Sequence, residues 1–397
     1  MKRSSPPAPP DNRLVLKIAE TEAELEASFH LLHDAYVASN FMLEHPNHLR
    51  VTHYHALPTT TTLCALYDGE VVGTISLIRE GVFGFPMQQA FNLQEIRKKG
   101  GQITEVSALA VHPRFRRTMG LVVLPLMKFM YGYCTRYFDT RHLVIAVNPS
   151  HIGFYESLLL FQRLDGQVVE NYGFVNGAPA VGAVLDLLEA PERMRQAYAD
   201  KVGTKRDFAQ YFLDAESPNI QWPARRYHVT NDPVMTPGLI DHFFNLRTDT
   251  FASTQRRQIA LLHSIYDGHE YGSCLPTLSA EEQALIDTRR HPRYSLHCPG
   301  KFWVRSSTKR QSFDLDVVNV SATGFSARMS AAIPPHTRGR ADIELGPQLH
   351  TSITASTVRQ CAVDDGQHLI SFRLHQSDAA WVAFIADLEA GTAHLAS

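Results

Sequence analysis

The sequence has few of the features that mark specialised classes of protein. Only five of its 397 residues are cysteines, and they are scattered without a C-x-x-C pair. This spacing predicts neither a zinc ribbon nor a disulfide framework, and free thiols fit a reducing compartment such as the cytoplasm. The most apolar run, Leu121–Met130, is too short to span a bilayer and contains Pro125 and Lys128.

An excess of charge of either sign is also missing. The chain has 38 Lys and Arg against 40 Asp and Glu, a formal net charge of −2. Proteins that bind a nucleic acid polymer usually carry a basic domain, so we expect no such partner. Residues 1–13 are rich in proline and have no apolar core, which predicts a disordered tail and not a signal peptide. The length predicts two or three domains.

Strands and helices alternate in the first half of the chain, which predicts an α/β domain over residues 14–190. Thr21 with Glu24 is a capping box that begins a helix, and Asp68-Gly69 between apolar runs predicts a hairpin. The expected strands are 14–19, 62–67, 71–78, 102–111, 142–147 and 180–187, and further helices are expected at 119–137 and 152–160. Pro125 should kink the first of these helices unless the helix begins there.

The second half of the chain has two regions with different sequence patterns. Residues 191–285 show short helical patterns around the loop Gln221-Trp222-Pro223, which predicts a helical extension packed on the first domain. Strand patterns return in residues 286–392, which predicts a small six-stranded β-barrel with a closing helix that carries Trp381. The expected strands are 301–306, 312–320, 324–329, 340–345, 352–363 and 369–374, and the closing helix is 378–388.

Three local patterns in the first half belong together. The strand Thr104–Pro113 runs into the basic loop Arg114-Phe115-Arg116-Arg117 and then, past Gly120, into a helix. A basic loop at a helix N-terminus makes an anion site, because backbone N–H groups and the helix dipole face the anion. Asn148-Pro149 and Gly153-Phe154-Tyr155-Glu156 follow. In this order, and downstream of the expected hairpin, the patterns resemble the GNAT acyltransferase fold.

A narrower resemblance covers about residues 14–190. The segment His30–Val37 and the Glu105-x-Ser107 motif resemble the autoinducer-synthase-like branch, and within it the long-chain N-acyl amino acid synthases. This resemblance implies transfer of a fatty acyl chain from acyl carrier protein to an amino acid amine. Ala108 replaces an arginine of autoinducer synthases, which disfavours a homoserine lactone product. Val122 replaces the last small residue of the GNAT loop, which disfavours coenzyme A.

The chemistry of amide formation assigns roles to the first domain. Glu105 is the expected general base, with a pKa that partial burial raises toward neutrality. The backbone N–H groups near Ala110 and Val111 are expected to face the thioester carbonyl, and Tyr155 to protonate the leaving thiolate. A strand-edge salt bridge for Glu105 and a core position for Tyr155 are the structural alternatives.

The donor is expected at the loop that follows. Arg114, Arg116 and Arg117, with Gly120, would hold the phosphopantetheine phosphate, and the arginines would meet the acidic surface of acyl carrier protein. Charges on such a rim accelerate association more than they tighten binding. A merely solvated basic loop is the alternative.

Four histidines, at positions 45, 48, 53 and 55, lie close together in the sequence. Imidazole suits zinc, but Pro46 interrupts the first pair and neither a cysteine nor a carboxylate completes a site. We therefore expect surface or substrate-loop histidines and no metal, with a zinc site as the alternative.

The second half carries a two-part motif. Arg289-Arg290-His291-Pro292-Arg293 is followed by Asn319-Val320-Ser321-Ala322-Thr323-Gly324 and then by the strand pattern and the Trp381 helix. Together they resemble a PilZ domain, the bacterial receptor for cyclic di-GMP, with its R-x-x-x-R arm and [D/N]-x-S-x-x-G strand.

The resemblance implies a cyclic di-GMP site made of six residues. Arg289, Arg290 and Arg293 would grip guanine O6 and N7 and stack on the purine. Asn319 and Ser321 would hydrogen-bond to the ligand, and Gly324 would permit close approach. A ligand-free barrel used for protein contacts is the alternative.

The hypothesis from the sequence is an N-acyltransferase that a C-terminal cyclic di-GMP receptor regulates. Two alternatives stay open: a catalytically inactive GNAT-like effector that acts by protein contacts, and an acyl-CoA-dependent acetyltransferase of protein lysines. The sequence also leaves open the acceptor amine, the acyl chain length, the direction of regulation and the oligomeric state, a homodimer included.

Overall fold

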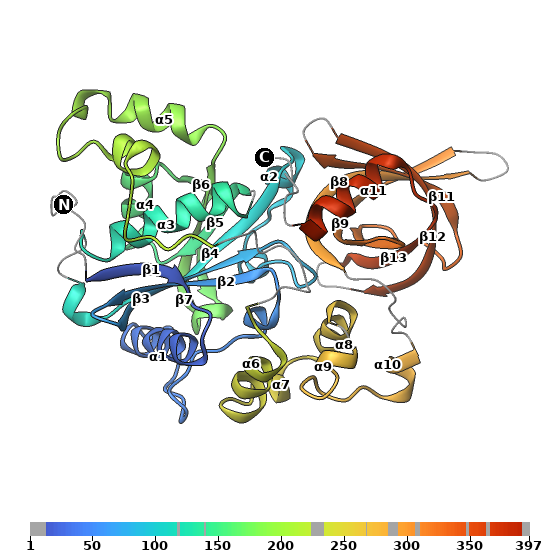
Figure 1. Ribbon diagram of the computed structural model, residues 1–397, viewed down its shortest axis with the longest axis horizontal. Coiled ribbons are helices and arrows are strands. Elements are labelled where there is room, and N and C mark those ends of the chain that lie inside the picture. The colour runs from blue at the N-terminus through green and yellow to red at the C-terminus, as the bar shows by residue number, and fades with distance from the viewer. Residues whose placement is uncertain are drawn as a thin grey trace.

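The structure is a computed structural model that describes residues 13–116, 120–138, 140–223, 234–266, 268–284, 293–305, 310–346, 349–362 and 366–390. A seven-stranded sheet and a closed six-stranded barrel lie side by side, and short helices run along one side from the sheet to the barrel (Figure 1). The predicted fold class, an α/β domain followed by an all-β barrel, is confirmed. The predicted tail at residues 1–13 lies outside the described ranges except for Arg13.

The sheet of the first domain has the strand order β1-β2-β3-β4-β5-β7-β6. Its strands are β1 (Leu14–Ile18), β2 (Thr60–Tyr67), β3 (Glu70–Arg79), β4 (Gln102–Val111), β5 (Thr140–Val147), β6 (Gln162–Tyr172) and β7 (Ala178–Asp186). Neighbours are antiparallel except β4 and β5, which are parallel. The sequence analysis missed β6, whose register with β7 is interrupted twice, so that its sequence shows no regular alternation.

Two predictions from local sequence in the first domain, the capping box and the hairpin turn, are confirmed. Thr21 accepts a hydrogen bond from the Glu24 backbone, and the Glu24 side chain accepts one from Thr21 N, which caps α1 (Glu22–Ala38) as predicted. Asp68 and Gly69 both have positive φ, 52° and 83°, as a two-residue hairpin turn between β2 and β3 requires.

Helices cover both faces of the sheet. The helices α3 (Val123–Arg136) and α4 (Ile152–Leu158) pack on one face, and α1 lies on the other (Figure 1). Pro125 falls in the first turn of α3, where its missing N–H would have no partner, so no kink is needed. Short helices fill the connections: η1 (His53–Ala56), η2 (Pro86–Gln89), α2 (Gln94–Lys98), η3 (Pro113–Phe115) and η4 (Gly173–Val175).

The residues after β7 are mostly helical and return to the first domain. The helices are α5 (Ala190–Ala197), η5 (Ala199–Lys201), η6 (Gln210–Asp214), α6 (Pro237–Asp241), η7 (His242–Leu246), α7 (Thr250–Ser253), α8 (Arg256–Ile265), α9 (Gly268–Tyr271) and α10 (Ala280–Ala284). Trp222 stacks on Tyr137 of the first domain, with ring centroids 5.7 Å apart. The Tyr266 hydroxyl donates to Ala56 O at 2.7 Å.

The C-terminal barrel closes in the order β10-β13-β12-β11-β8-β9. Its elements are β8 (Tyr294–Arg305), β9 (Arg310–Ser321), β10 (Gly324–Met329), β11 (Arg338–Gly346), β12 (Leu349–Ala362), β13 (His368–Gln376) and the closing helix α11 (Ala379–Ala390). Trp381 is fully buried and its Nε1 donates to Ser321 O at 3.2 Å, which fixes α11 to the barrel.

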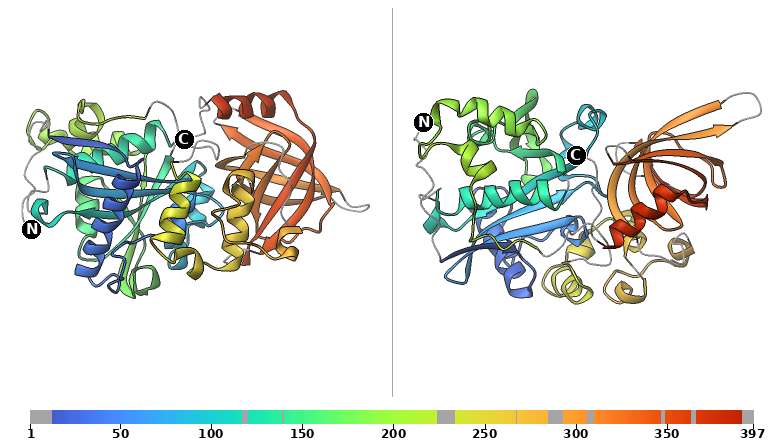
Figure 2. Two further views of the ribbon diagram at one scale, coloured as in Figure 1. Left: turned by 60° about the horizontal axis from the view of Figure 1, so that its bottom comes forward. Right: turned by 45° about the horizontal axis from the view of Figure 1, so that its top comes forward.

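One of the apolar clusters extends through all three parts. A single cluster of buried side chains joins Phe29 of the first domain, Phe243 of the extension, and Val318 and Leu369 of the barrel. Figure 2 shows the later helices of the extension, α6 to α10, lying beside the sheet and the barrel. Within the described ranges, no helix is both long and apolar enough to cross a membrane.

Candidate functional site

A cleft opens where β4 and β5 part. They pair from Gln102 to Glu105 only. Beyond Glu105, β4 pairs with β3 alone and β5 with β7 alone. A bulge at Ala108, whose φ of 56° is rare for alanine, helps β4 to bend away. The resulting cleft has a volume of about 540 Å³ and presents two strand edges to a ligand.

The cleft brings together most of the predicted acyl-transfer residues. Those that line it are Glu105, Ala110, Val111, Arg116 and Tyr155. Arg114 and Gly120 do not line it, and Arg117 lies outside the described residues.

Glu105 lies at the point where the two strands separate. It is 2% exposed and accepts a hydrogen bond from the Met87 backbone at 3.0 Å. Within the described residues it has no ion pair, so the structure does not show the strand-edge salt bridge. Burial raises the pKa of Glu105 to about 8, which confirms the expected direction. A carboxyl group that titrates near neutrality has the property that a general base needs.

Tyr155 is a core residue that also lines the cleft. Its ring packs edge-on against Phe154 and Phe161, with centroids 5.2 Å and 5.9 Å away, so it belongs to the core. The same residue lines the cleft. Burial raises the pKa of its phenol, so the hydroxyl keeps its proton at neutral pH and can act as a donor.

The backbone amides of β4 alternate in direction. His112 N donates to Val72 O at 2.9 Å, and the next residue pair along the ladder is Val111 with Gly73. Because paired and unpaired positions alternate in an antiparallel ladder, the Val111 amide points away from β3, to the open edge. The Ala110 amide faces β3. Of the two predicted amides, Val111 is therefore the better placed toward the cleft.

Arg114 and Arg116 of the basic loop have different surroundings. Arg116 is exposed at the cleft, and its Nε donates to Val111 O at 3.1 Å. Arg114 pairs instead with Glu70 at 3.3 Å, with both side chains at least half exposed. Of these two arginines, Arg116 is therefore the one placed to bind an anion in the cleft.

Two residues that the sequence analysis did not single out complete the cleft. They are Tyr36 of α1 and Tyr172 of the missed strand β6, and both line the cleft. Tyr172 is 2% exposed, and its hydroxyl has no hydrogen-bond partner within the described part of the chain. A buried donor without a partner is rare in proteins and fits a ligand group at this place. Only the tertiary structure shows this position.

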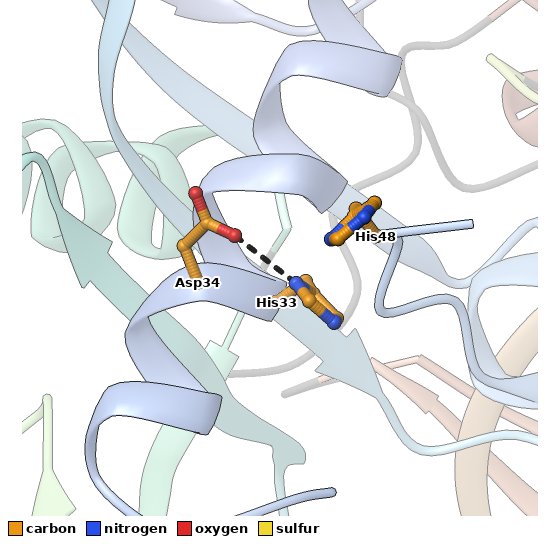
Figure 3. Close-up of side chains that lie close together, drawn as sticks. All are labelled: His33, Asp34 and His48. Atoms are coloured by element: carbon orange, nitrogen blue, oxygen red, sulfur yellow. Dashed lines mark hydrogen bonds and ion pairs between the residues drawn. The ribbon is translucent and has the colours of Figure 1, made fainter. Parts of the chain in front are cut away.

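The histidines hold the loop after α1. His33 Nδ1 lies 3.0 Å from the Asp34 carboxylate (Figure 3). His33 Nε2 accepts from His45 N at 3.1 Å. Although His33, Asp34 and His48 lie close together, both nitrogens of the buried His33 are thus engaged. His55 is buried, accepts from Thr52 N at 3.0 Å, and burial lowers its pKa to about 3. These contacts give His33 and His55 structural roles, and the absence of a metal at the four predicted histidines stays a prediction.

A polar row crosses the barrel at the predicted nucleotide residues. Arg293 Nη1 donates to Ser326 Oγ at 3.4 Å, and Ser326 lies 3.2 Å from Ser371. Asn319 faces Ser326 across the β9–β10 ladder. Its Oδ1 is buried and has no hydrogen-bond partner within the described ranges, so it can accept from a ligand N–H. The sequence analysis missed both serines because the strand register alone brings them here.

The other nucleotide residues have structural roles or lie outside the description. The Ser321 hydroxyl donates to Gly324 O at 3.1 Å and closes the β9–β10 turn. A Cβ on Gly324 would lie 2.3 Å from Phe372 O, so the close approach of β13 requires glycine there. Arg289 and Arg290 lie outside the described residues.

An ionic cluster joins the barrel to the first domain. The buried Glu80 carboxylate lies 2.9 Å from Arg97 Nε and 3.5 Å from Arg328 Nη1 of β10. His297 of β8 is 3.8 Å away. Burial alone would raise the pKa of Glu80, but Arg97, His297 and Arg328 together lower it. Glu80 is therefore a charged anchor between the two domains.

The anchor belongs to the same loop that contacts Glu105. Arg328 Nη2 donates to Gly81 O at 2.6 Å, which fixes the start of the loop to the barrel. Six positions further along this loop, Met87 N donates to the Glu105 carboxylate. A shift of the barrel would therefore reach the hydrogen bond on Glu105 through one short segment.

A known protein family and several solved structures are similar to parts of this chain. Residues 27–186 match the family described as N-acyl amino acid synthase FeeM. No curated protein matches the chain. The structure of FeeM, an N-acyl amino acid synthase from uncultured soil microbes, is 26% identical over 47% of this chain and 98% of that one, with a TM-score of 0.41.

Two further solved structures are similar to parts of this chain. BjaI, a CoA-dependent acyl-homoserine lactone synthase, is 19% identical over 54% of this chain and 95% of its own, with a TM-score of 0.39. The PilZ domain of YcgR from Escherichia coli, solved with cyclic di-GMP, is 18% identical over 26% of this chain and 93% of its own, with a TM-score of 0.21. The family match and the cleft identify the first domain as an acyltransferase domain.

Proposed function

We propose that this protein transfers a long-chain acyl group from acyl carrier protein to the amine of an amino acid, and that cyclic di-GMP bound to the barrel regulates the transfer. The observation that carries the proposal is a buried Glu105 beside two open strand edges, within the segment that matches N-acyl amino acid synthases. The boundaries of the three parts at residues 190 and 285 remain a prediction.

The proposed reaction needs a neutral amine and a base. The amine nitrogen attacks the thioester carbonyl carbon, and the ionised Glu105 takes the proton that the nitrogen loses. With a pKa near 8, the Glu105 carboxylate is basic enough to take this proton and can release it again near neutral pH. The carbon–sulfur bond then breaks and the amide forms.

Two groups serve the charges that develop. The Val111 amide on the open edge of β4 would donate to the carbonyl oxygen as it becomes an oxyanion. Tyr155 would pass its hydroxyl proton to the departing thiolate while it takes up the proton that Glu105 removed from the amine, because a phenol whose pKa burial raises is too weak an acid to release a proton unaided. Since a thiolate is a good leaving group, this second contribution is the smaller one.

The donor would enter along the splayed strands. The amide groups of a pantetheine arm can pair with a strand edge that has no partner, as an extra strand would. Arg116 at the cleft would meet the phosphate and the acidic carrier protein. This arrangement supports a carrier-bound donor, with Arg117 as a further predicted contact.

Regulation would begin on the polar row of the barrel. Arg293 and Asn319 offer a cation and an unsatisfied acceptor to a guanine base. Ser326 of this row lies two residues from Arg328, which pairs with Glu80. A ligand bound on the row would therefore weaken or strengthen the contact between the two domains. The loop between Glu80 and Met87 would carry the change to Glu105.

The proposed function is tested by product analysis. The full chain is incubated with palmitoyl-acyl carrier protein and the twenty amino acids, and the products are identified by mass spectrometry, with Glu105→Gln in parallel. We expect an N-acyl amino acid from the wild type and far less from the variant. Free fatty acid alone, or equal product from both proteins, would contradict the proposal.

A further inference from the structure

A cavity separate from the cleft lies where the three parts of the molecule meet. Its volume is about 750 Å³. The first domain contributes the loop around Thr52 and Tyr54, the extension contributes Gln258 of α8, and the barrel contributes Arg328 and Gln367. We call it the junction cavity. None of the roles described above uses it.

A thin wall separates the junction cavity from the acyl-transfer cleft. Phe174 lines both spaces. Between them is a gap of about 10 Å³, which Tyr36 and Arg50 line together with Ser107 and Ala108 of β4. A small molecule placed at this wall therefore has the junction cavity on one side and the strand that carries Glu105 on the other.

Arg50 is the cation of this wall. Its guanidinium lies 4.2 Å from the centre of the Tyr36 ring and 5.2 Å from that of Phe174, and Nη2 donates to Phe174 O at 2.9 Å. No carboxylate of the described residues lies within ion-pair distance of Arg50. Burial lowers its pKa, because the cation loses water and receives no protein anion in return. Such a guanidinium is well suited to a carboxylate from a ligand.

Two tyrosines link Arg50 to the reacting centre. Burial raises the pKa of Tyr36, Arg50 lowers it, and Glu105 raises it further, so this phenol senses both charges. The unpartnered Tyr172 hydroxyl also lies near both Arg50 and Glu105, whose opposite charges affect its pKa after the larger effect of burial. An anion site and a base thus flank the same pair of phenols.

We propose that Arg50 binds the α-carboxylate of the acceptor amino acid at this wall, with the amine directed to Glu105 and the side chain in the junction cavity. The proposal deepens the function proposed above and rests on it. In an α-amino acid a single carbon joins the amine to the carboxylate. Because the gap at this wall holds only about 10 Å³, binding requires the rings of Tyr36 and Phe174 to move apart, so that the carboxylate meets Arg50 and the amine meets Glu105. Tyr172 is placed to donate to the same carboxylate.

Other cations of the junction cavity fit this role less well. Arg328 is already paired with Glu80 and bonded to Gly81 O. Arg257 lines the cavity but not the gap next to β4. Aromatic Tyr54 and Phe83 and polar Gln258 are among its further lining residues, and its volume of about 750 Å³ accommodates a large side chain.

The test removes the charge from either partner in turn. The full chain is assayed with palmitoyl-acyl carrier protein and two probes: the best amino acid acceptor and its primary carboxamide. We expect the wild type to prefer the acid by about 10- to 100-fold in kcat/KM. Arg50→Gln should lose this preference, mainly through a higher KM for the acid, while the KM for the acyl donor stays unchanged.

Two further variants guard the interpretation. Arg50→Lys keeps the charge and should retain part of the preference even if Arg50→Gln folds poorly. Arg136→Gln removes an exposed arginine stacked on Trp222 at 4.9 Å, far from both cavities, and should behave as the wild type.

The outcomes separate this inference from the proposed function. A wild type that acylates amino acids but accepts the acid and the carboxamide equally would overturn the role of Arg50 alone. The same holds if Arg50→Gln keeps the full preference. A wild type that acylates no amine would overturn the proposed function and this inference with it.

Discussion

Two buried glutamates of one domain show how neighbours decide the chemistry of a carboxylate. Glu80 and Glu105 are 1% and 2% exposed. Burial alone would raise the pKa of Glu80, but Arg97, His297 and Arg328 outweigh it and lower the pKa. Around Glu105 the described residues supply one backbone hydrogen bond and no cation, and burial raises its pKa to about 8.

The difference assigns the two residues to different tasks. A carboxylate surrounded by cations stays ionised, costs much to disturb and joins the surfaces that supply those cations. A carboxyl group that only burial affects exchanges its proton near neutral pH. Glu80 thus belongs to the domain contact and Glu105 to the chemistry, and the loop that contains Met87 connects them.

The largest expected effect tests the chemical side of the comparison. Glu105→Gln should lower kcat by about 10²- to 10⁴-fold, because the amide cannot take a proton but still accepts the Met87 hydrogen bond. Steady-state rates with palmitoyl-acyl carrier protein provide the measurement. Glu95→Gln, which changes an exposed glutamate of α2, is the control and should leave kcat unaltered. A Glu105→Gln enzyme with at least half the wild-type rate would remove Glu105 from the mechanism.

The anchor side of the comparison is tested by stability. Glu80→Gln leaves Arg97, Arg328 and His297 buried without their common anion, which should cost about 3–5 kcal/mol of unfolding free energy. Urea unfolding followed by tryptophan fluorescence measures the loss. Glu156→Gln breaks the more exposed pair with Arg163 and should have a much smaller effect. Equal losses in the two variants would show that Glu80 is not an anchor.

The pH dependence of stability sharpens the same contrast. With its folded pKa near 8, Glu105 keeps a proton that the unfolded chain releases above its ordinary pKa of 4.5. Stability from this group therefore falls as the pH rises from about 4.5 to 8. Glu105→Gln abolishes the fall, so the variant should gain about 2–4 kcal/mol on the wild type between pH 5 and 8. A constant difference across this range would contradict the raised pKa.

A smaller effect is expected at the nucleotide row. Arg293→Ala should weaken cyclic di-GMP binding by about 10- to 100-fold, since it removes a charge-assisted contact to guanine. Calorimetry on the full chain measures the affinity. Arg340→Ala, which alters an arginine of the same barrel paired with Asp342 at 2.8 Å, is the matched control. If both variants bind as the wild type does, the polar row is not the nucleotide site.

Local signals in the sequence predicted much of the fold. The capping box at Thr21, the turn at Asp68-Gly69 and the strand Gln102–Val111 each depend on neighbouring residues only, and the structure has all three. The strand Gln162–Tyr172 was missed, because interruptions in its register remove the periodicity that marks a strand.

Much of the candidate site depends on contacts between distant parts of the chain. Glu105 could be predicted from the sequence because the residues of its motif are contiguous. Arg50 was not, since its environment includes Phe174, 124 positions away in the sequence. The Glu80 anchor likewise needs Arg328 of the barrel, and Tyr172 gains its position from the missed strand.

The most direct test of the link between the two glutamates is the initial rate of acyl transfer by the full chain, measured with and without saturating cyclic di-GMP. The account predicts that the nucleotide changes kcat/KM by about 5- to 150-fold, as expected for a coupling of 1–3 kcal/mol between sites. Tight binding of the nucleotide with unchanged rate constants would contradict it.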